Sequence, residues 1–314
     1  MRVALAGAGA FGIKHLDALA RIEDVEVVSI VSRTLEQAEK IAAIYGARQA
    51  TVNLSDALNS PDVDAVILCT PTQLHAEQAI ATLQAGKHVL VEIPLADSWM
   101  DAHAVSEVAK SKNLVCMVGH TRRFNPSHQW IHQRILDGKL SIQQMDVQTY
   151  FFRRTNTNAL GNPRSWTDNL LWHHAAHTID LFAYQCGESI ETANVLAGPA
   201  HATLGIPMDM SIQLKSQSGK LCTVSLSFNN DGPLGTFFRY ICDNGTYIAR
   251  YDDLTTGNDE PIDVSNVAVS MDGIELQDRE FLRAIREGDE PNSSIASVLS
   301  CYRVLDQLQA QLHA

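Results

Sequence analysis

The stretch that most constrains the fold is a glycine-rich hexapeptide close to the start of the chain. Residues 7–12 read GAGAFG, and they follow directly on a short apolar run at residues 2–6. A helical pattern of apolar side chains begins immediately afterwards. In this setting the first glycine permits a tight turn, the second lets backbone amides approach a pyrophosphate, and the third allows a helix to pack close to a strand. A purely structural turn is the alternative, but it requires neither the strand before the motif nor the helix after it.

Continuously apolar segments alternate with helical ones over the first part of the chain. We expect strands at residues 2–6, 25–31, 65–69, 88–91 and 114–118, and helices at residues 13–19, 35–45, 75–85 and 98–110. Strands without polar alternation are buried on both faces, which is typical of a parallel sheet covered by helices. The order of elements therefore predicts an α/β fold with a doubly wound parallel sheet, a Rossmann domain, over residues 1–121.

After about residue 120 the pattern changes to that of an α+β domain. We expect a helix at 125–136, strands at 145–152, 210–215, 221–229, 237–243 and 247–251, and helices at 276–287 and 294–312. The sequences QSGK and DNGT, which separate pairs of these strands, are typical of hairpin turns. The sequence therefore predicts a second domain over residues 122–314 with an open, mostly antiparallel sheet, and its C-terminal helices can pack back on the first domain.

Charge and cysteine content limit the partners and the compartment. The formal net charge is -12, which argues against nucleic acid and anionic membranes, because both are bound through an excess of Lys and Arg. The six cysteines form no C-x-x-C pair and several stand in apolar runs, a pattern typical of a reducing cytosol. The first residues resemble neither a signal peptide nor a membrane span. We therefore expect a cytoplasmic protein that acts on a small molecule.

The second expected strand ends in Ser32 and Arg33, about 20 residues after the glycine motif. Proteins that bind NAD carry Asp or Glu there to bind the ribose 2′-OH, whereas an arginine can meet a 2′-phosphate through charge-assisted hydrogen bonds. The sequence therefore favours NADP, with NAD at lower preference. The alternative is that Arg33 is only a solvated surface side chain.

Three histidines and an aspartate gather in the segment Trp172–Asp180, which reads WHHAAHTID. In a regular helix His173, His177 and Asp180 share one face, and the apolar residues of the segment take the opposite one. We expect such an imidazole-lined face to border a pocket. Because histidine titrates near neutral pH, it is the natural group to accept a proton there.

A metal site is one alternative for this segment. His173 and His177 have the i, i+4 spacing of helical zinc ligands. However, no glutamate completes an H-E-x-x-H motif, and no cysteine stands within the segment. We therefore expect no bound metal.

Along nearly its whole length the chain resembles the Gfo/Idh/MocA family of dehydrogenases. The segments that carry the resemblance are GAGAFG (7–12), CTPTQLHAEQA (69–79), EIP (92–94), RRFNP (122–126), HHAAHTID (173–180) and EFLRAIREGDEP (280–291). The resemblance implies a Rossmann domain followed by a domain with an open, largely antiparallel sheet. It also implies a nicotinamide dinucleotide as cofactor.

The resemblance further implies which residues contact this cofactor. Thr70, Pro71 and His75 would line it, and Glu92 would lie near the nicotinamide ribose. Together with the glycine motif and the end of the second strand, the expected cofactor-binding residues are Gly7, Gly9, Ala10, Phe11, Gly12, Ser32, Arg33, Cys69, Thr70, Pro71, Thr72, His75 and Glu92.

Two positions depart from the family pattern. The family's E-K-P motif has a lysine where this chain has Ile93, and its D-x-x-x-H motif has an aspartate where this chain has His173. The missing lysine argues against the family's usual oxidation of sugars and inositols. Proton transfer is therefore expected to depend on histidines, with His177 as the base and His173 sharing the proton. Asp180 is expected either to orient His177 or to have a structural role.

Within the family, the chain is most similar to cytosolic, dimeric dehydrogenases of aromatic catabolism that oxidise a cyclic hemiacetal bearing two carboxylates. Such a dianion needs focused positive charge, and arginine binds carboxylates in bidentate pairs. The expected substrate-binding residues are Arg122, Arg123, Arg153, Arg164, Trp166 and His174, with Arg154 and Trp172 as further candidates. A homodimer is expected, with the exposed face of the antiparallel sheet as its interface.

Two other functions are compatible with the sequence. One is an NAD(P)-dependent sugar or polyol dehydrogenase of the same family, against which Ile93 argues. The other is a non-catalytic sensor that binds NADP(H) and a partner protein, and such a sensor would have no need of a histidine cluster.

Overall fold

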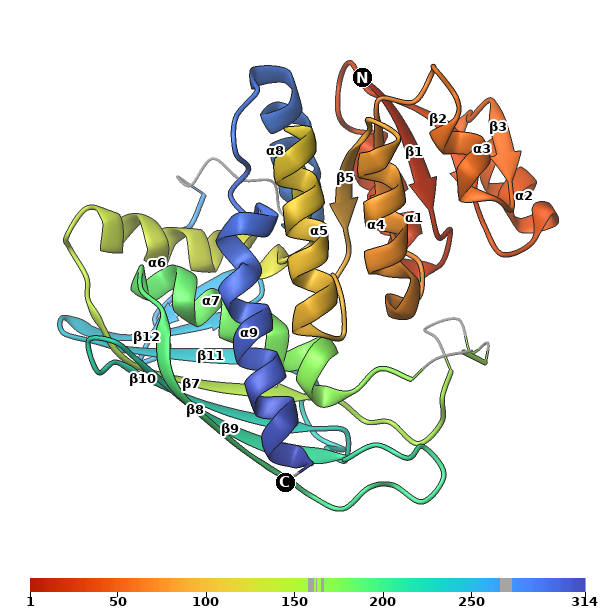
Figure 1. Ribbon diagram of the computed structural model, residues 1–314. Coiled ribbons are helices and arrows are strands. Elements are labelled where there is room, and N and C mark those ends of the chain that lie inside the picture. The colour runs from red at the N-terminus through yellow and green to blue at the C-terminus, as the bar shows by residue number, and fades with distance from the viewer. Residues whose placement is uncertain (158–160, 162, 165–166, 266–272, 314) are drawn as a thin grey trace. The chain divides into compact units, whose positions relative to one another are not determined.

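The computed structural model describes residues 1–157, 161, 163–164, 167–265 and 273–313 (Figure 1). The chain forms two compact units. The first unit contains Met1–Gly119 and Ile274–Leu299, and the second contains His120–Gly273 and Ser300–Ala314. The segment 274–299 therefore belongs with the amino-terminal residues, although it stands near the other end of the sequence.

In the described residues of the first unit, six strands form a parallel sheet in the order β3-β2-β1-β4-β5-β6. The strands are β1 (Arg2–Ala6), β2 (Glu26–Val31), β3 (Gln49–Thr51), β4 (Ala65–Leu68), β5 (His88–Val91) and β6 (Cys116–Val118). Val3, Ala4 and Leu5 are fully buried, as in a strand covered on both faces. The predicted doubly wound sheet is confirmed. The strand β3 was not expected, because its three residues are too short to show a pattern.

Helices connect and accompany these strands, and their ends follow local sequence signals. Thr34 and Ser98 are N-caps whose hydroxyls accept hydrogen bonds from the backbone amides of Gln37 and Asp101. Gly46 ends a helix with φ +76°, a conformation that favours glycine. The helices of this unit are α1 (Ala10–Leu19), α2 (Leu35–Tyr45), α3 (Leu54–Leu58), α4 (His75–Gln84), α5 (Trp99–Lys112) and most of α8 (Gly273–Glu287), with a short 3₁₀ turn at Thr72–Leu74.

Among the described residues of the second unit, seven strands form a sheet in the order β13-β12-β11-β7-β10-β9-β8. They are β7 (Ile142–Tyr150), β8 (Ile190–Ala197), β9 (Asp209–Ser216), β10 (Leu221–Ser227), β11 (Gly235–Cys242), β12 (Gly245–Arg250) and β13 (Asp253–Thr256). The pair β7–β10 is parallel and the other pairs are antiparallel. The predicted mostly antiparallel sheet is therefore confirmed, as are the hairpins at QSGK and DNGT, which join β9 to β10 and β11 to β12.

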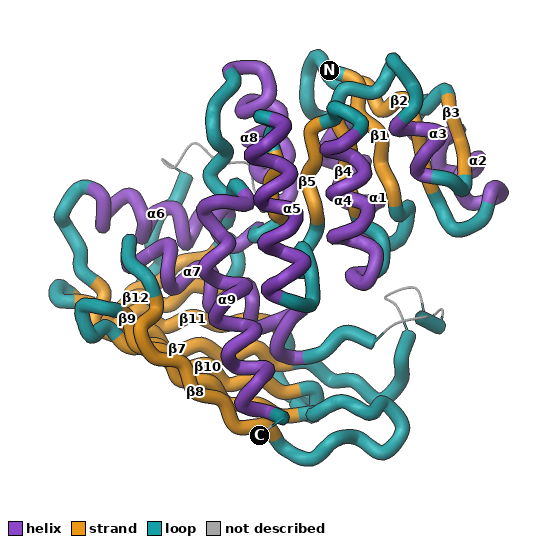
Figure 2. The backbone as a smooth tube through the Cα atoms, in the orientation of Figure 1, coloured by secondary structure: helices purple, strands orange, loops and turns teal. Residues whose placement is uncertain are grey.

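Helices cover one face of this second sheet. Figures 1 and 2 show α6 (Pro126–Leu136) and α7 (Ala176–Cys186) lying on it, and in this view no helix of the described residues covers the opposite face. Along β9, Met210, Ile212 and Leu214 are buried while the residues between them are exposed, which is the alternation of a half-buried strand. A 3₁₀ turn (Thr121–Phe124) precedes α6, and α9 (Ile295–Leu312) begins in the first unit and continues in the second. None of the described helices is both long and apolar enough to cross a bilayer.

The histidine segment is not the single regular helix expected from the sequence. Leu170–Ala175 form a π-helical turn, and the α-helix α7 begins only at Ala176. A π turn winds more residues per turn than an α-helix, so it changes the directions of the side chains that precede α7. The expectation of one continuous 3.6-residue face is therefore wrong for the first histidines of the segment.

Candidate active site

The glycine motif of the first unit contains two positions from which a side chain is excluded. The φ angle of Gly7 is +98°, and a Cβ there would lie 2.3 Å from the carbonyl oxygen of Cys69. A Cβ on Gly12 would lie 2.2 Å from the carbonyl oxygen of Gly7. These approaches match the tight turn and the close helix packing that the motif predicts.

Gly9 differs from both, because a Cβ there would meet no described atom within 4 Å. Gly9 is also the N-cap of α1, and no side chain caps the helix at this end. The amides that open a helix carry partial positive charge and bind phosphate groups. The loop therefore fits the pyrophosphate of a dinucleotide, which the backbone of Gly9, Ala10 and Phe11 would hold.

At the carboxyl end of β2, Ser32 and Arg33 differ in their surroundings. Ser32 is buried, and its hydroxyl donates to Gln37 Oε1 at 2.9 Å, while Gln37 Nε2 donates to the carbonyl oxygen of Ala8 at 2.9 Å. This chain of hydrogen bonds ties the end of β2 to the glycine motif. Arg33 is exposed, and no carboxylate of the described residues forms an ion pair with it. Its guanidinium is therefore available to a phosphate.

The segment after β4 is fixed by internal hydrogen bonds. Thr70 donates its hydroxyl to Gln78 Oε1 at 2.6 Å. His75 is buried, and its ring nitrogens lie 2.8 Å from the carbonyl oxygen of Pro94 and 2.7 Å from that of Thr70. Burial lowers the pKa of His75. His75 therefore holds two backbone segments together, whereas the resemblance implied that it lines the cofactor directly. Cys69, Pro71 and the buried Thr72 belong to the same segment.

Glu92, just after β5, is part of a buried polar network that the sequence did not reveal. Its Oε1 lies 3.1 Å from His15 Nε2 and accepts a hydrogen bond from Gln277 Nε2 at 3.2 Å. The other ring nitrogen of His15 faces Asp278, and both side chains are fully buried. The only signal in the sequence was a polar residue on the apolar side of the first helix, and its partners stand more than 70 positions away.

In the second unit, Arg123 is bound by a carboxylate of its own chain. Its Nε and Nη2 donate to the two oxygens of Asp180 at 2.8 and 2.6 Å, and both residues are buried. The guanidinium also lies over the ring of Tyr184, 4.5 Å from the centroid. Two expectations are therefore corrected. Asp180 orients Arg123 and not His177, and Arg123 has a structural partner in place of a substrate carboxylate.

Arg122 has the opposite environment. Its Nη1 donates to Asn125 Oδ1 at 3.3 Å and its guanidinium stacks on Tyr251, 4.8 Å from the centroid. Its Nε is buried without a hydrogen-bond partner, and no carboxylate of the described residues forms an ion pair with it. Burial lowers the pKa of Arg122. Tyr251 and the carboxylate of Asp252 oppose this effect without forming an ion pair, so the guanidinium can still take an anionic ligand.

Arg153 and Arg164 share one carboxylate, that of Asp168. Arg153 approaches both oxygens, with Nη2 2.9 Å from Oδ2, and Arg164 Nη1 lies 2.9 Å from Oδ1. Two guanidinium groups on one carboxylate leave a net positive charge. The pKa of Arg153 is lowered to about 10, first by burial and then by the positive charge of Arg164. The structure thus brings these two predicted residues together, whereas Arg154 donates mainly to backbone carbonyl oxygens and to Asn229.

His174 and His177 are held neutral beside these arginines. The pKa of His174 is lowered to about 3, first by burial and then by Arg153, Arg122 and Arg164. The pKa of His177 is lowered well below its usual value, first by burial and then by Arg122. In the described residues, His174 Nε2 and His177 Nδ1 are buried without a hydrogen-bond partner. His177 Nδ1 can therefore accept a proton or a hydrogen bond from a ligand, whereas His174 Nε2 faces Asp168 Oδ2 at 3.5 Å.

The neighbour of His177 is not the one that the sequence suggested. His173 turns back towards the start of its helix, where its Nδ1 accepts a hydrogen bond from the amide of Asn169 at 3.2 Å. The ring that meets His177 is that of the buried His120, with centroids 6.2 Å apart in an edge-on arrangement. His120 Nδ1 lies 3.5 Å from Asp180 Oδ2. Since His120 stands more than 50 positions before His177, spacing along the chain could not indicate the contact.

The two tryptophans that were expected to line the substrate site, and the possible metal ligands, remain to be placed. Trp172 is buried and donates from Nε1 to Gln309 Oε1 at 3.0 Å, so it belongs to the core of the second unit. Trp166, the other expected wall, lies outside the described residues. Nowhere in the described part of the chain do three His, Cys, Asp or Glu side chains gather as a metal ion would require.

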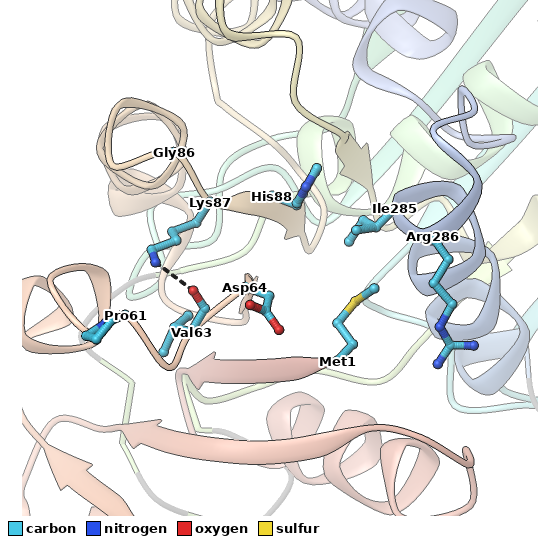
Figure 3. A pocket seen from close by; sticks show the side chains of 9 residues that line it. All are labelled: Met1, Pro61, Val63, Asp64, Gly86, Lys87, His88, Ile285 and Arg286. Atoms are coloured by element: carbon cyan, nitrogen blue, oxygen red, sulfur yellow. Dashed lines mark hydrogen bonds between the residues drawn. The ribbon is translucent and has the colours of Figure 1, made fainter.

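A hollow of about 420 Å³ in the first unit lies away from these residues. It is lined by Met1, Asp64, Lys87, His88 and Arg286, among others, at the amino ends of β1 and β5 (Figure 3). Lys87 points to backbone oxygens, with Nζ 2.6 Å from the carbonyl oxygen of Val63. Doubly wound sheets bind ligands at the carboxyl ends of their strands, so this hollow does not correspond to the nucleotide site.

Comparison with known proteins matches both parts of the chain to oxidoreductases. Residues 1–120 match the model of an oxidoreductase family with an NAD-binding Rossmann fold, and residues 126–268 match that of the C-terminal domain of bacterial oxidoreductases. The chain is 72% identical over 312 residues to the 4-carboxy-2-hydroxymuconate-6-semialdehyde dehydrogenase of Sphingobium sp. strain SYK-6, covering 99% of each chain.

More distant relatives share the fold. Inositol 2-dehydrogenase of Rhizobium meliloti is 28% identical over 231 residues, which cover 72% of this chain and 68% of that protein. The solved structure of levoglucosan dehydrogenase with NADH and L-sorbose superposes with a TM-score of 0.88 at 21% identity, covering 100% of this chain and 96% of that one.

Proposed function

Because the chain belongs to the oxidoreductase family with an NAD-binding Rossmann fold, we propose that it is an NADP-dependent dehydrogenase of protocatechuate 4,5-cleavage. Its substrate is the cyclic hemiacetal of 4-carboxy-2-hydroxymuconate-6-semialdehyde, and its product is 2-pyrone-4,6-dicarboxylate. The name of the 72% identical relative supports the pathway. The observation that carries the proposal is the half-buried Arg122, which forms no ion pair with a carboxylate of the described residues and whose charge helps to keep two imidazoles neutral.

The two substrate carboxylates require two positive sites. Arg122 supplies one, because its guanidinium forms no ion pair with a carboxylate of the described residues and interacts with Asp252 only at longer range. The other is the pair Arg153 and Arg164, in which one aspartate balances two positive charges. Arginine can bind each carboxylate through two parallel hydrogen bonds, which fixes the orientation of the ring as well as its affinity. His174, beside the second site, contributes a neutral hydrogen-bonding group.

His177 accepts the proton in the proposed reaction. A bound nicotinamide dinucleotide supplies the hydride acceptor. As the C–H bond of the hemiacetal carbon breaks, the O–H proton passes to the ring of His177 and the C=O bond of the lactone forms. The neutral state of His177 in the free protein makes it ready for this role. Binding of a substrate carboxylate to Arg122 would offset the charge that disfavours the protonated ring, and so raise the pKa of His177 during the reaction.

The preference for NADP rests on Arg33. Its exposed guanidinium follows β2 where proteins specific for NAD carry a carboxylate. Replacing Arg33 with Ala should raise the KM for NADP by about tenfold or more, since one charged hydrogen-bonding group is lost, and should leave the KM for NAD nearly unchanged. Equal changes for the two nucleotides would contradict the assignment.

The protein is further proposed to be a cytoplasmic homodimer. All six cysteines are free, as in a reducing compartment. The exposed face of the second sheet, for example at Gln213 and Thr223, is the proposed contact between subunits.

The experiment that tests the proposal supplies the ring-cleavage product of protocatechuate to the purified protein, with NADP and NAD in parallel, and identifies the product by chromatography. Formation of 2-pyrone-4,6-dicarboxylate, faster with NADP, is expected. Reduction of nucleotide with inositol or a sugar but not with this substrate would favour a polyol dehydrogenase. No nucleotide reduction with any of them would favour a binding protein without catalytic activity.

A further inference from the structure

A buried imidazole joins two carboxylates in the first unit. His15 of α1 is fully buried, and its Nδ1 lies 2.8 and 3.0 Å from the two oxygens of Asp278 in α8. Its Nε2 lies 3.1 Å from Oε1 of Glu92. The ring therefore bridges the segment after β5 and a helix that comes from the C-terminal part of the chain.

This geometry determines the protonation of His15. An ionised carboxylate only accepts hydrogen bonds, so a ring with a carboxylate at each nitrogen satisfies both only when both nitrogens carry a proton. His15 must then be an imidazolium. One positive charge buried between two negative ones also avoids the high cost of an isolated buried charge.

The titratable groups around His15 agree with this state. Among the described residues they are Asp278 from α8, Glu92 from the segment after β5 and Cys69 from the segment after β4. Burial opposes the charged ring, yet the carboxylate of Asp278 raises the pKa of His15 well above its usual value. Burial raises the pKa of Cys69, so this thiol stays protonated at neutral pH.

Glu92 is confined from its other sides as well. Gln277 Nε2 donates to its Oε1 at 3.2 Å. A Cβ on Gly119 would lie 2.5 Å from the same oxygen, so the backbone of this glycine closes against the carboxylate. The side chain is nearly buried, with 11% of it exposed. These contacts hold the carboxylate of Glu92 in one orientation and leave only a small part of it exposed.

We propose that His15 is a positioning residue for the nucleotide, which acts by holding Glu92 in one orientation and is itself held by Asp278. This inference rests on the proposed contact between Glu92 and the nicotinamide ribose. Its consequence is that nucleotide affinity depends on α8, a helix more than 180 positions away from Glu92 in the sequence.

The first experiment measures the dissociation constant of NADP by fluorescence titration for the wild type and for Glu92→Gln, His15→Gln and Arg21→Gln. Arg21 is the matched control, because its Nε forms another ion pair with α8, to Glu275 at 2.8 Å. Glu92→Gln and His15→Gln should each weaken binding on the order of tenfold, the effect of one charge-assisted hydrogen bond. Arg21→Gln should bind like the wild type.

The second experiment uses Asp278→Asn and follows the same dissociation constant from about pH 6 to about pH 8. A raised pKa keeps His15 charged below that pKa, and the charge is lost as pH rises through it. Without Asp278 the largest contribution that raises this pKa is lost, while burial still lowers it. Binding by Asp278→Asn should therefore weaken as pH rises, while binding by the wild type should not change through this group. Circular dichroism and the melting temperature identify variants that fail to fold.

The outcomes separate the two proposals. If Glu92→Gln binds NADP as the wild type does, the proposed role of Glu92 is wrong. If Glu92→Gln weakens binding but folded His15→Gln does not, the role of His15 is overturned. A pH dependence of Asp278→Asn identical to that of the wild type would also overturn it, because a merely structural histidine would not link nucleotide affinity to pH.

Discussion

At the residue scale, the chemistry of the second unit depends on how many carboxylates face each guanidinium group. Arg123 forms a bidentate ion pair with Asp180, Arg153 and Arg164 share Asp168, and Arg122 forms no ion pair with a carboxylate of the described residues. An arginine with a buried partner stabilises the fold, whereas one without is free to bind an anion. The adjacent arginines 122 and 123 therefore have different proposed roles, a distinction that the dipeptide itself does not reveal.

Substitution of these two neighbours should separate the roles. Arg122→Met should raise the KM for the substrate by about tenfold or more and leave the fold intact, because a carboxylate ligand is lost. Arg123→Met should instead lower the free energy of unfolding by about 3–5 kcal/mol, because the buried Asp180 would lose its bidentate partner. Steady-state kinetics and denaturant unfolding measure the two effects. A stable Arg123 variant, or an unchanged KM in the Arg122 variant, would contradict them.

The pH dependence of kcat/KM tests the base. His177 acts in its neutral form, and its pKa in the free protein is lowered by burial and then by Arg122, His120 and His174. Activity controlled by this group should therefore persist as pH falls below the usual histidine range, about 6.5. Arg122→Met removes one of the charges that lower this pKa and should move the acid limb to higher pH. An acid limb near 6.5 in the wild type, unmoved in this variant, would exclude His177 as the base.

At the element scale, prediction succeeded where burial along the chain is continuous or regularly alternating, and failed where it shows neither pattern. The hairpin of β9 and β10 could be predicted because Met210, Ile212 and Leu214 alternate with polar residues. The strand β8 (Ile190–Ala197) was missed because it lies at the edge of the sheet with little of it buried, so no period of two is visible. The π turn before α7 was missed because hydrophobic periodicity assumes a regular helix.

The start of this π turn depends on one cap. The side chain of Asn169 accepts a hydrogen bond from the amide of Trp172 at 2.8 Å. Asn169→Ala should lower the free energy of unfolding by about 1 kcal/mol, while Asn169→Asp, which keeps the acceptor, should stay close to the wild type. Since the same turn carries His173 and His174, the Ala variant should also have the lower kcat. Equal stability of the two variants in denaturant unfolding would show that the cap does not matter.

At the scale of the whole molecule, the two units divide the proposed chemistry between them. The residues proposed for the dinucleotide belong to the first unit and those proposed for the substrate to the second. Motifs predicted both sets, because glycine turns and clustered arginines and histidines are local in sequence. The partners that fix them, such as Asp278 for His15 and Asp180 for Arg123, are contacts over long separations that a single sequence does not show.

The oligomeric state is also a property of the whole molecule. Thr223 and Gln213 are directly paired neighbours on the exposed face of the second sheet. Thr223→Arg in both subunits would place like charges in the proposed symmetric contact, so it should convert a homodimer to a monomer. Light scattering after size-exclusion chromatography measures the mass. A wild-type monomer, or a variant of unchanged dimeric mass, would show that this face is not the interface.

Selection of a dicarboxylate substrate is measured by the ratio of kcat/KM for the carboxylated hemiacetal to that for myo-inositol, with NADP as the nucleotide. If buried arginines and neutral histidines select a dicarboxylate, the hemiacetal should be preferred by on the order of a hundredfold or more, because a neutral polyol leaves Arg122 unpaired. A ratio near one, or a preference for inositol, would show that these side chains do not select a dicarboxylate.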